Sequence, residues 1–374
     1  MNFTISSTAL SGKLSSLSRV INSKNPIAIL ESFLFEIKDG KLFLTASDGD
    51  NVMKTSLILD EVEGEGAFAV NNKNILDAVK ELPEQPLHIN VNMDEFRIMI
   101  EYQNGYYDFP IISSTEYPVS RSVDEPFTTI TLSSEILLDN ITRSLFATAQ
   151  DELRPIMNGI YFDLQKDHLA IVATDGHKLV RNRNTSIKSE KIASFILPKK
   201  PASLLKSSIT KEDNDVVIRF DSKVAEFSYV GGSLSCSLIE GKYPNYNGVI
   251  PENNPNQITI DRKSLIGALR RVLPFASDSS ELIRFSVSNS SLEVNAEDFD
   301  FSTKAKEKII CNYSGTPMSI GFKGSNFIEI LNNLQGDDVN IELADPSRAG
   351  IIIPVEQPEN QDVLMLIMPM LLND

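Results

Sequence analysis

Asp175 and His177, which follow an apolar run and lie two residues apart, come closest to a catalytic arrangement in this sequence. Such a pair can orient a general base in a hydrolase. However, no serine or cysteine nucleophile occupies a recognisable elbow, and the related positions Asp48 and Asp298 are not followed by histidine. A hydrolase that uses Asp175 and His177 is therefore kept only as an alternative.

Histidine and cysteine are too few and too scattered for a metal centre or a redox pair. The three histidines are His88, His168 and His177, and they form no H-E-x-x-H pattern. Cys236 and Cys311 lack the spacing of a zinc knuckle or a redox motif. No glycine-rich phosphate loop follows an apolar strand. We therefore expect no metal, no cofactor and no catalytic activity of the chain's own.

Composition limits the kind of partner that the whole surface can bind. The chain has 374 residues, 41% of them hydrophobic, which suits two or three well-packed domains. Its formal net charge of -16 disfavours adhesion to a polyanion, so any role on DNA must be confined by geometry. The first residues do not resemble a secretion signal, and no apolar run approaches the ~20 residues of a membrane span. We expect a cytoplasmic protein.

The elements that position these residues repeat three times along the chain. The segments 3–10, 130–137 and 258–265 share one pattern, roughly 127 residues apart. In each, alternating apolar residues lead to a helix N-cap, at Ser6, Ser133 or Asp261. Apolar residues then recur at helical spacing and predict one buried helix face. The members of these three series are Leu10, Leu14, Leu17 and Ile21, then Leu137, Ile141 and Leu145, then Leu265, Leu269 and Leu273.

Two further blocks repeat and complete the predicted domain. The segments 42–48, 169–175 and 292–298 read as strands, and each third contains a second helix between two strands. The thirds end alike at Tyr117-Pro118, Tyr243-Pro244 and Met368-Pro369. We predict an α+β fold of three repeated domains, at 1–124, 125–252 and 253–374. A tandem repeat could also form a binding module without a role on DNA, which remains an alternative.

Basic residues are concentrated on the predicted helices, whereas acidic residues dominate the strands and loops. Lys73 and Lys80 lie on the second helix of the first third, and Lys199 and Lys200 begin the corresponding helix of the second third. Helices with modest positive charge could follow DNA phosphates without reading bases. The alternative is that these lysines only solvate helix surfaces.

Four segments, at 154–160, 173–179, 240–246 and 367–370, resemble signature segments of the bacterial sliding clamps, the beta subunits of DNA polymerase III, in order and spacing. The resemblance covers essentially the whole chain. It implies DNA-clamp domains with two helices packed on antiparallel sheets, assembled as a head-to-tail dimeric ring around duplex DNA. Such a ring acts as a processivity factor without an enzyme activity. The implied partners are the replicative polymerase, a clamp loader and other replication and repair proteins.

The resemblance also implies three sets of site residues. For the dimer interface these are Tyr106, Tyr107, Leu273, Pro274 and Phe275. The implied DNA-facing residues are Lys24, Lys73, Gln150, Lys199 and Lys200, to which the charge pattern adds Lys80. A hydrophobic pocket for partner peptides is implied at Met157, Thr174, Gly176, His177, Lys178, Leu179, Pro244, Val249, Leu366, Ile367, Met368, Pro369, Met370 and Leu371. Gly248 stands where many family members carry arginine. One wall of this pocket therefore lacks a charged rim.

Overall fold

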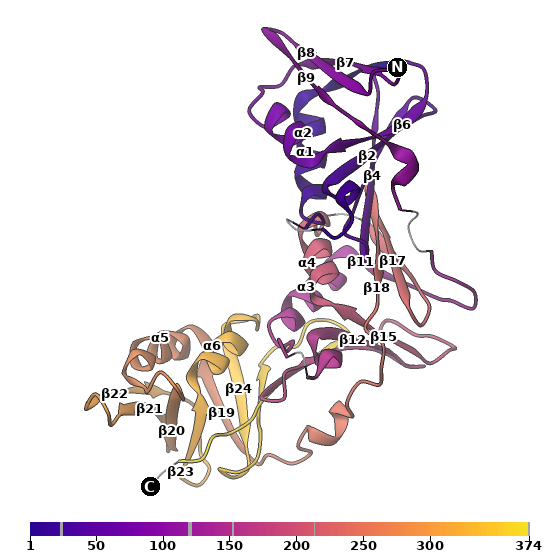
Figure 1. Ribbon diagram of the computed structural model, residues 1–374. Coiled ribbons are helices and arrows are strands. Elements are labelled where there is room, and N and C mark those ends of the chain that lie inside the picture. Colours follow the sequence, from indigo (N-terminus) through magenta and orange to yellow (C-terminus); the bar gives the residue numbers. More distant parts are fainter. Residues whose placement is uncertain (23–24, 119–121, 152, 213, 373–374) are drawn as a thin grey trace. The chain divides into compact units, whose positions relative to one another are not determined.

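The computed structural model describes residues 1–22, 25–118, 122–151, 153–212 and 214–372 (Figure 1). The chain divides into two compact units. The first contains Met1–Leu138 and Lys200–Leu238, and the second contains Asp139–Lys199 and Ile239–Asp374. Each unit therefore combines one end of the chain with part of its middle.

The first unit contains two sheets. Its five-stranded sheet has the order β5 (Glu61–Glu63), β1 (Asn2–Ser6), β7 (Pro86–Asn92), β8 (Arg97–Tyr102) and β9 (Gly105–Pro110). Its nine-stranded sheet has the order β10 (Ile112–Ser113), β6 (Gly66–Asn71), β2 (Ser32–Lys38), β3 (Lys41–Ser47), β4 (Asn51–Ile58), β18 (Gly232–Ser237), β17 (Val224–Tyr229), β16 (Asp215–Phe220) and β11 (Thr128–Ser133).

The second unit also contains two sheets. Its eight-stranded sheet has the order β15 (Ala193–Pro198), β12 (Gly159–Leu164), β13 (Leu169–Thr174), β14 (Lys178–Asn184), β26 (Gln361–Ile367), β25 (Gly350–Pro354), β24 (Asp338–Leu343) and β19 (Asn256–Asp261). Its four-stranded sheet has the order β22 (Thr303–Ile310), β21 (Ser291–Asp298), β20 (Leu282–Ser288) and β23 (Met318–Lys323).

Six α-helices occur in the described part of the chain, two in each third of the sequence, as predicted. They are α1 (Ser7–Ser18), α2 (Asn72–Val79), α3 (Ser134–Leu145), α4 (Lys199–Ser208), α5 (Arg262–Val272) and α6 (Gly324–Asn332). Every ladder between the described strands is antiparallel. None of the described helices is long and apolar enough to cross a bilayer.

The three predicted helix N-caps are confirmed. The side-chain oxygen of Ser6 accepts the amide N–H of Ala9 at 3.1 Å, and Asp261 accepts that of Ser264 at 2.7 Å. Ser133 makes the matching bond to the third residue beyond it, at 3.3 Å. A cap satisfies one of the backbone donors that a helix start leaves without a partner. The same local chemistry therefore starts one helix in each third.

The apolar helix faces are buried as the spacing predicted, except at their last positions. Leu14, Ile141 and Leu269 have no exposed surface. Ile21, Leu145 and Leu273 are only half-buried, because each is the last residue of its helix or lies beyond its end. A 3.6-residue period stops directing side chains toward the core once the helix has ended.

Each unit contains one ladder that joins two different thirds of the sequence. In the first unit β4 pairs with β18, so that Val52 lies opposite Ser235. In the second unit β14 pairs with β26, so that Leu179 lies opposite Leu366. We call these ladders the first seam and the second seam. Figure 1 shows β4 beside β18 within the first unit.

The predicted correspondence of Met368-Pro369 with Tyr243-Pro244 is wrong. The amide of Met368 donates to the His177 carbonyl at 2.8 Å, directly beyond the second seam. At the first seam the equivalent donor is Ser237, whose amide donates to the Asp50 carbonyl at 2.8 Å. The chemically similar Tyr-Pro and Met-Pro pairs therefore occupy different places in their domains.

The cap of α5 can be tested with two substitutions at one position. Asp261→Ala should lower the free energy of unfolding by about 1 kcal/mol, because the amide of Ser264 loses its acceptor. Asp261→Asn keeps an acceptor oxygen and should remain close to the wild type. Urea unfolding followed by circular dichroism measures both values. Equal losses in the two variants would contradict the capping role.

Candidate partner-binding site

Several residues predicted for the partner pocket lie on one face of the eight-stranded sheet in the second unit. Side chains alternate along the second seam, so that Leu179 and Leu366 join one buried cluster. Their neighbours Val180 and Met365 join the separate core that also contains residues of α5 and α6. We call the sheet face that carries Leu179 and Leu366 the outer face.

Aromatic side chains from the segment 239–250 complete the outer-face cluster. The rings of Tyr161 and Tyr243 stack with centroids 4.6 Å apart and an interplanar angle of 3°. The hydroxyl of Tyr246 donates to Asp163 at 2.7 Å. Burial raises the pKa of Tyr243 and of Tyr246, so both phenols stay neutral. Sequence analysis did not place these tyrosines in the site, although both lie in the segment 240–246 that carries the resemblance.

The turn between β13 and β14 is fixed by Asp175. One carboxylate oxygen accepts the amide N–H groups of His177 and Lys178, each at 2.9 Å. Gly176 has a φ of +90°, and a Cβ there would lie 3.0 Å from a guanidinium nitrogen of Arg154. Glycine therefore satisfies both the backbone conformation and the close approach of an arginine.

The second oxygen of Asp175 holds a buried ammonium group. Lys178 is 6% exposed, and its Nζ lies 2.8 Å from Asp175 and 3.2 Å from Glu329. Burial alone would lower the pKa of Lys178, but its two carboxylate partners outweigh this effect and raise it. The pKa of Asp175 is lowered: burial opposes the charged form, and the bonds to Lys178 and the turn amides overcome it. Asp175 thus acts as a structural anion, because its two oxygens are engaged by the turn amides and by Lys178.

The C-terminal segment continues from the second seam along the second unit. After Met368 has bonded to the turn, the amide of Met370 donates to the Gly321 carbonyl on β23 at 2.8 Å. A Cβ at Gly321 would lie 2.7 Å from the carbonyl oxygen of Met370, so this edge admits the chain only where a glycine stands. Leu371 then remains 87% exposed.

The structure brings most of the predicted pocket residues to this one region. Leu179 and Leu366 lie in the outer-face cluster, and the turn residues Thr174, Gly176 and His177 border it. Met157, Pro244 and Val249 are sequence neighbours of Ile156, Tyr243 and Ile250, which belong to this cluster or pack against it. The remaining members follow the second seam along the chain, and they are Met368, Pro369, Met370 and Leu371.

Lys178 and Ile367 differ from the other predicted pocket residues. They lie opposite one another in the second seam, and Ile367 belongs to the core shared with α5 and α6. Lys178 likewise reaches Glu329 on α6. A strand directs neighbouring residues to opposite faces, so the side chains of these two lie away from the outer face.

The first seam repeats the geometry of the second without its apolar outer face. Asp48 accepts the amides of Asp50 and Asn51 at 3.0 and 2.7 Å, as Asp175 does in its turn. On the outer face, however, Ser235 stands where the second seam has Leu366, opposite Val52. The two seams therefore share a backbone plan, but of the two only the second has leucines at both of these paired positions on its outer face.

Three residues of the first unit are predicted to face DNA, and they lie in two kinds of environment. Lys73 and Lys80 are exposed on α2 and line a groove of about 530 Å³ beside α1. Lys80 pairs with Asp77 at 2.8 Å. Lys200 is bound more firmly, because its ammonium lies 2.6 Å from Asp48 and 2.7 Å from the Val20 carbonyl. Lys200 thus ties the start of α4 to the first seam.

The two residues of the second unit that are predicted to face DNA also differ in their surroundings. Gln150 is exposed, whereas Lys199 donates to the carbonyls of Thr148 and Ala149 at 3.3 and 3.1 Å. Burial, together with repulsion from Lys178, lowers the pKa of Lys199. The remaining predicted contact, Lys24, lies outside the described residues.

The predicted dimer residues lie beside strands at sheet ends. Tyr106 is 65% exposed on β9, the last strand of the five-stranded sheet, and Tyr107 stacks on Tyr102 with centroids 5.0 Å apart. Leu273, Pro274 and Phe275 form a short 3₁₀ turn (Leu273–Phe275) in the second unit. Phe275 is 40% exposed, and the turn adjoins β22, the end strand of the four-stranded sheet.

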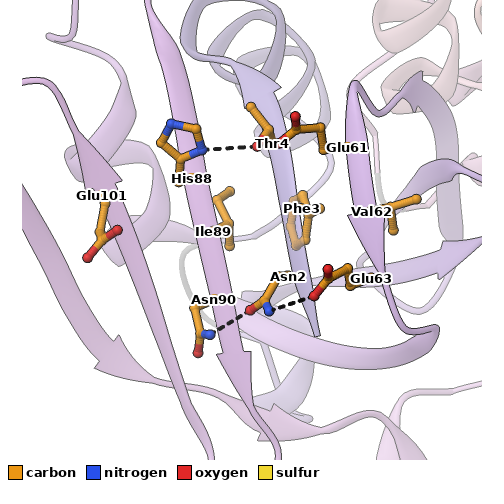
Figure 2. Close-up of a pocket in the computed structure, with 10 residues that line it drawn as sticks. All are labelled: Asn2, Phe3, Thr4, Glu61, Val62, Glu63, His88, Ile89, Asn90 and Glu101. Carbon is orange, nitrogen blue, oxygen red and sulfur yellow. Dashed lines mark hydrogen bonds between the residues drawn. The ribbon is translucent and has the colours of Figure 1, made fainter.

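The five-stranded sheet also carries an acidic groove of about 630 Å³ (Figure 2). His88 and Thr4 bond across it at 3.0 Å. Neither lysine nor arginine occurs among the described residues that line it, which include Glu61, Glu63 and Glu101. No group of described histidine, cysteine, aspartate and glutamate side chains is suited to hold a metal ion.

Comparison with known proteins identifies the family. Models of the DNA polymerase III beta subunit match the chain in order, with the N-terminal domain at residues 1–121, the central domain at 131–245 and the C-terminal domain at 247–371. The chain belongs to the DNA polymerase III beta subunit family. This confirms the predicted α+β fold of three clamp domains.

Individual relatives agree with the family models. The beta sliding clamps of Pseudomonas aeruginosa and Escherichia coli are each 25% identical to the chain, over 99% of it and 100% of the relative. A crystal structure of the Pseudomonas aeruginosa clamp bound to griselimycin matches with a TM-score of 0.94 at 23% identity, over all of both chains. The Bacillus subtilis clamp matches with a TM-score of 0.92 at 20% identity.

Family membership decides between the alternatives left by the sequence. The family consists of non-catalytic processivity factors of DNA replication, so the chain is a replication clamp protein rather than an enzyme. A repeat-type module without a role on DNA is likewise excluded. The role of the Asp175 turn is therefore structural, because it ends the second seam.

The buried pair at this turn predicts a pH-dependent stability. Asp175→Asn should cost about 3 kcal/mol near neutral pH, because the buried ammonium of Lys178 loses its nearest anion. The lowered pKa of Asp175 supplies stability above the ordinary carboxyl pKa of about 4, and this is lost as pH falls through the folded value. Urea unfolding should therefore separate wild type and variant at pH 7 and bring them together at acid pH.

A matched control exists at Asp77, which pairs with Lys80 at the same spacing and the same 2.8 Å distance. Both partners are half exposed there, so Asp77→Asn should leave the unfolding midpoint unchanged. An equal loss at Asp77 and Asp175 would contradict the importance of burial.

Proposed function

We propose that two copies of this chain close head-to-tail into a ring around duplex DNA, which slides without reading sequence and tethers the replicative polymerase. The proposal is carried by β9 in the first third and β22 in the last third, each of which is an end strand with one neighbour in its sheet. An exposed edge of backbone donors and acceptors is normally covered or paired. Two such edges on opposite thirds suit a heterologous contact that closes after two copies.

The charge distribution supports topological retention rather than adhesion. The net charge is -16, and Lys80 and Lys200 each have an acidic partner within the protein. Exposed residues such as Lys73 and Gln150 are left to face DNA. Weak, scattered phosphate contacts keep a duplex centred without holding it, which is what a sliding ring requires.

The partner pocket is proposed on the outer face of the second seam. Its buried base includes Leu179 and Leu366, while Val249 and Met368 are 54% and 42% exposed and available for contact. Flexible methionine and leucine side chains can adapt to a short peptide. We propose that the replicative polymerase, the clamp loader and other replication and repair proteins dock here in turn.

We also propose domain limits at 1–124, 125–252 and 253–374, and a cytoplasmic location. The limits follow the helix pairs of the three thirds. They cut across the two compact units, because the seams attach strands of the middle third to both neighbours.

The ring itself is tested by DNA topology. Protein loaded by its clamp loader onto nicked circular DNA should stay bound through gel filtration, and linearising the DNA should release it within minutes. Retention should resist added salt, whereas free protein should bind linear duplex weakly and lose that binding as ionic strength rises. Tight binding of unloaded protein to linear DNA at high salt would overturn the proposal.

The same assay tests the dimer contact. Replacing Leu273 and Phe275 with aspartate should give monomers by light scattering and abolish retention, because an interface core would then have to bury charge. Phe43→Asp alters a phenylalanine with 38% exposure, close to the 40% of Phe275, and should leave the dimer intact. A dimeric double variant would show that the interface lies elsewhere.

The pocket is tested by shortening the chain. Deleting residues 370–374 should abolish binding of a fluorescent peptide taken from the replicative polymerase, because the Met370 bond to β23 holds one wall in place. A chain ending at residue 372 is the control and should keep full affinity. Fluorescence anisotropy measures both, and light scattering checks that the dimer persists. Unchanged affinity in the shorter chain would contradict the pocket assignment.

A further inference from the structure

The two lysines that begin α4 run against the dipole of their own helix. The N-terminus of a helix is the positive end of this dipole, so a cation in the first turn is disfavoured. Lys199 and Lys200 are nevertheless the first two residues of α4, and the first turn contains no acidic residue. Lys199 donates to the carbonyls of Thr148 and Ala149. Lys200 is compensated more completely.

All three donors of the Lys200 ammonium group are engaged within the protein. An ammonium carries three N–H bonds and no acceptor. Lys200 donates to the Val20 carbonyl at 2.7 Å, to the side-chain oxygen of Asn22 at 2.6 Å and to Asp48 at 2.6 Å. A DNA phosphate could bind this group only by displacing one of these acceptors. Charge and resemblance predicted that Lys200 faces DNA, but its hydrogen bonds are directed into the protein.

The second seam contains a lysine that is bound in the same way. Lys178 donates to Asp175 at 2.8 Å and to Asn326 at 3.3 Å, and it lies 3.2 Å from Glu329. In both seams the lysine binds one oxygen of the turn aspartate, while the other oxygen accepts the turn amides. One lysine comes from the turn itself and the other from a helix. The repetition of the arrangement from different sources indicates a structural task that both seams share.

Lys200 connects the end of α1 to the Asp48 turn. α1 ends at Ser18, and Val20 and Asn22 follow shortly after it. The C-terminal end of a helix is the negative end of its dipole and has carbonyl groups without intrahelical partners, so it attracts an ammonium group. Asp48 supplies the third acceptor from the turn. One ammonium group therefore fixes two separate segments of the first third against α4.

The pair of Lys200 and Asp48 is costly to break. The side chain of Asp48 is only 4% exposed. Burial opposes its charged form, but the bonds from Lys200 and from the turn overcome this effect and lower the pKa of Asp48. Removing one partner of a buried pair leaves an uncompensated charge, which is strongly destabilising. A weak, exchangeable phosphate contact does not compensate for such a loss, so Lys200 stays bound to the protein.

Arg19 is the exposed cation at this end of α1. It is the C-cap residue of the helix, and among the described residues its guanidinium has neither a hydrogen bond nor an ion pair. It lies four residues after Ser15, which lines the groove of about 530 Å³ that Lys73 also lines. Residues four apart share one face of a helix. Arg19 therefore lies on the groove side of α1.

We propose that Lys200 is a positioning residue rather than a DNA contact, and that it holds the end of α1 so that Arg19 meets the phosphates of duplex DNA. The inference rests on the proposed clamp function and changes which residue of the first unit makes the contact. Arginine stays charged and can donate two parallel N–H bonds to one phosphate. Arg19 has no internal bond to give up, whereas Lys200 would have to break one of three.

A double-mutant cycle on DNA affinity tests the positioning role. Arg19→Gln should weaken binding of the free protein to linear duplex at low salt and reduce the slope of log K against log salt by about 0.9. Lys200→Gln should weaken binding in the wild-type background, because the end of α1 loosens. It should have no further effect in a chain that already carries Arg19→Gln. Fluorescence anisotropy over a salt series measures the four proteins.

Lys191→Gln is the control for net charge. Lys191 is exposed between β14 and β15 and lies on none of the helices, so its replacement should leave the affinity and the salt slope at the wild-type values. A loss equal to that of Arg19→Gln would show that only net charge matters and would contradict a contact at Arg19.

Asn22→Ala tests the same lock without changing any charge. It removes one acceptor from the Lys200 ammonium, and it should weaken DNA binding only while Arg19 is present. A Lys200 that contacted phosphate directly would bind DNA at least as well in this variant. Asn22 is exposed, so the variant also keeps the test decisive if Lys200→Gln fails to fold. Urea unfolding checks that each variant is folded.

The outcomes separate this inference from the proposed function. Additive losses from Lys200→Gln and Arg19→Gln, or an Asn22→Ala variant that binds DNA like the wild type, would overturn the positioning role while the clamp stands. A wild type that is not retained on nicked circular DNA after loading would overturn the proposed ring itself.

Discussion

The second seam is the interaction on which the rest of the candidate site depends. Its ladder joins Lys178–Asn184 to Gln361–Ile367, two segments from different thirds of the chain. Because strand side chains alternate, the register of this ladder decides that Leu179 and Leu366 lie on the outer face and that Val180 and Met365 lie in the core. A slip by one residue would exchange the two sets and destroy both the pocket and the core.

The comparison of the two seams separates what holds the fold from what belongs to the proposed partner site. Both end in an aspartate turn. In each turn the aspartate carboxylate accepts the amide N–H of the residue that begins the next strand, Asn51 or Lys178. Only the second carries an apolar outer face covered in part by Tyr243 and Tyr246. Backbone pairing is thus common to the repeats, whereas the proposed binding site depends on a few side chains that alternation directs to the outer face.

Local patterns predicted the helices well, because caps such as Ser6 and Asp261 act on amides three residues away. They could not predict that Lys200 would be bound by Asp48, since that contact joins distant parts of the sequence. The inward direction of Lys178 also depends on a strand register that composition does not reveal. The alignment of Met368 with Tyr243 failed for a related reason, because similar residues need not hold similar places in a ladder.

The distribution of thiols gives each compact unit a built-in reporter. Cys236 lies on β18 in the first unit, and Cys311 follows β22 in the second; both are buried and free. Burial raises the pKa of Cys236 to about 12 and raises that of Cys311 as well, so neither forms the reactive thiolate while its unit stays closed. The rate at which each thiol reacts with a maleimide in the native protein would therefore time the opening of one unit independently of the other.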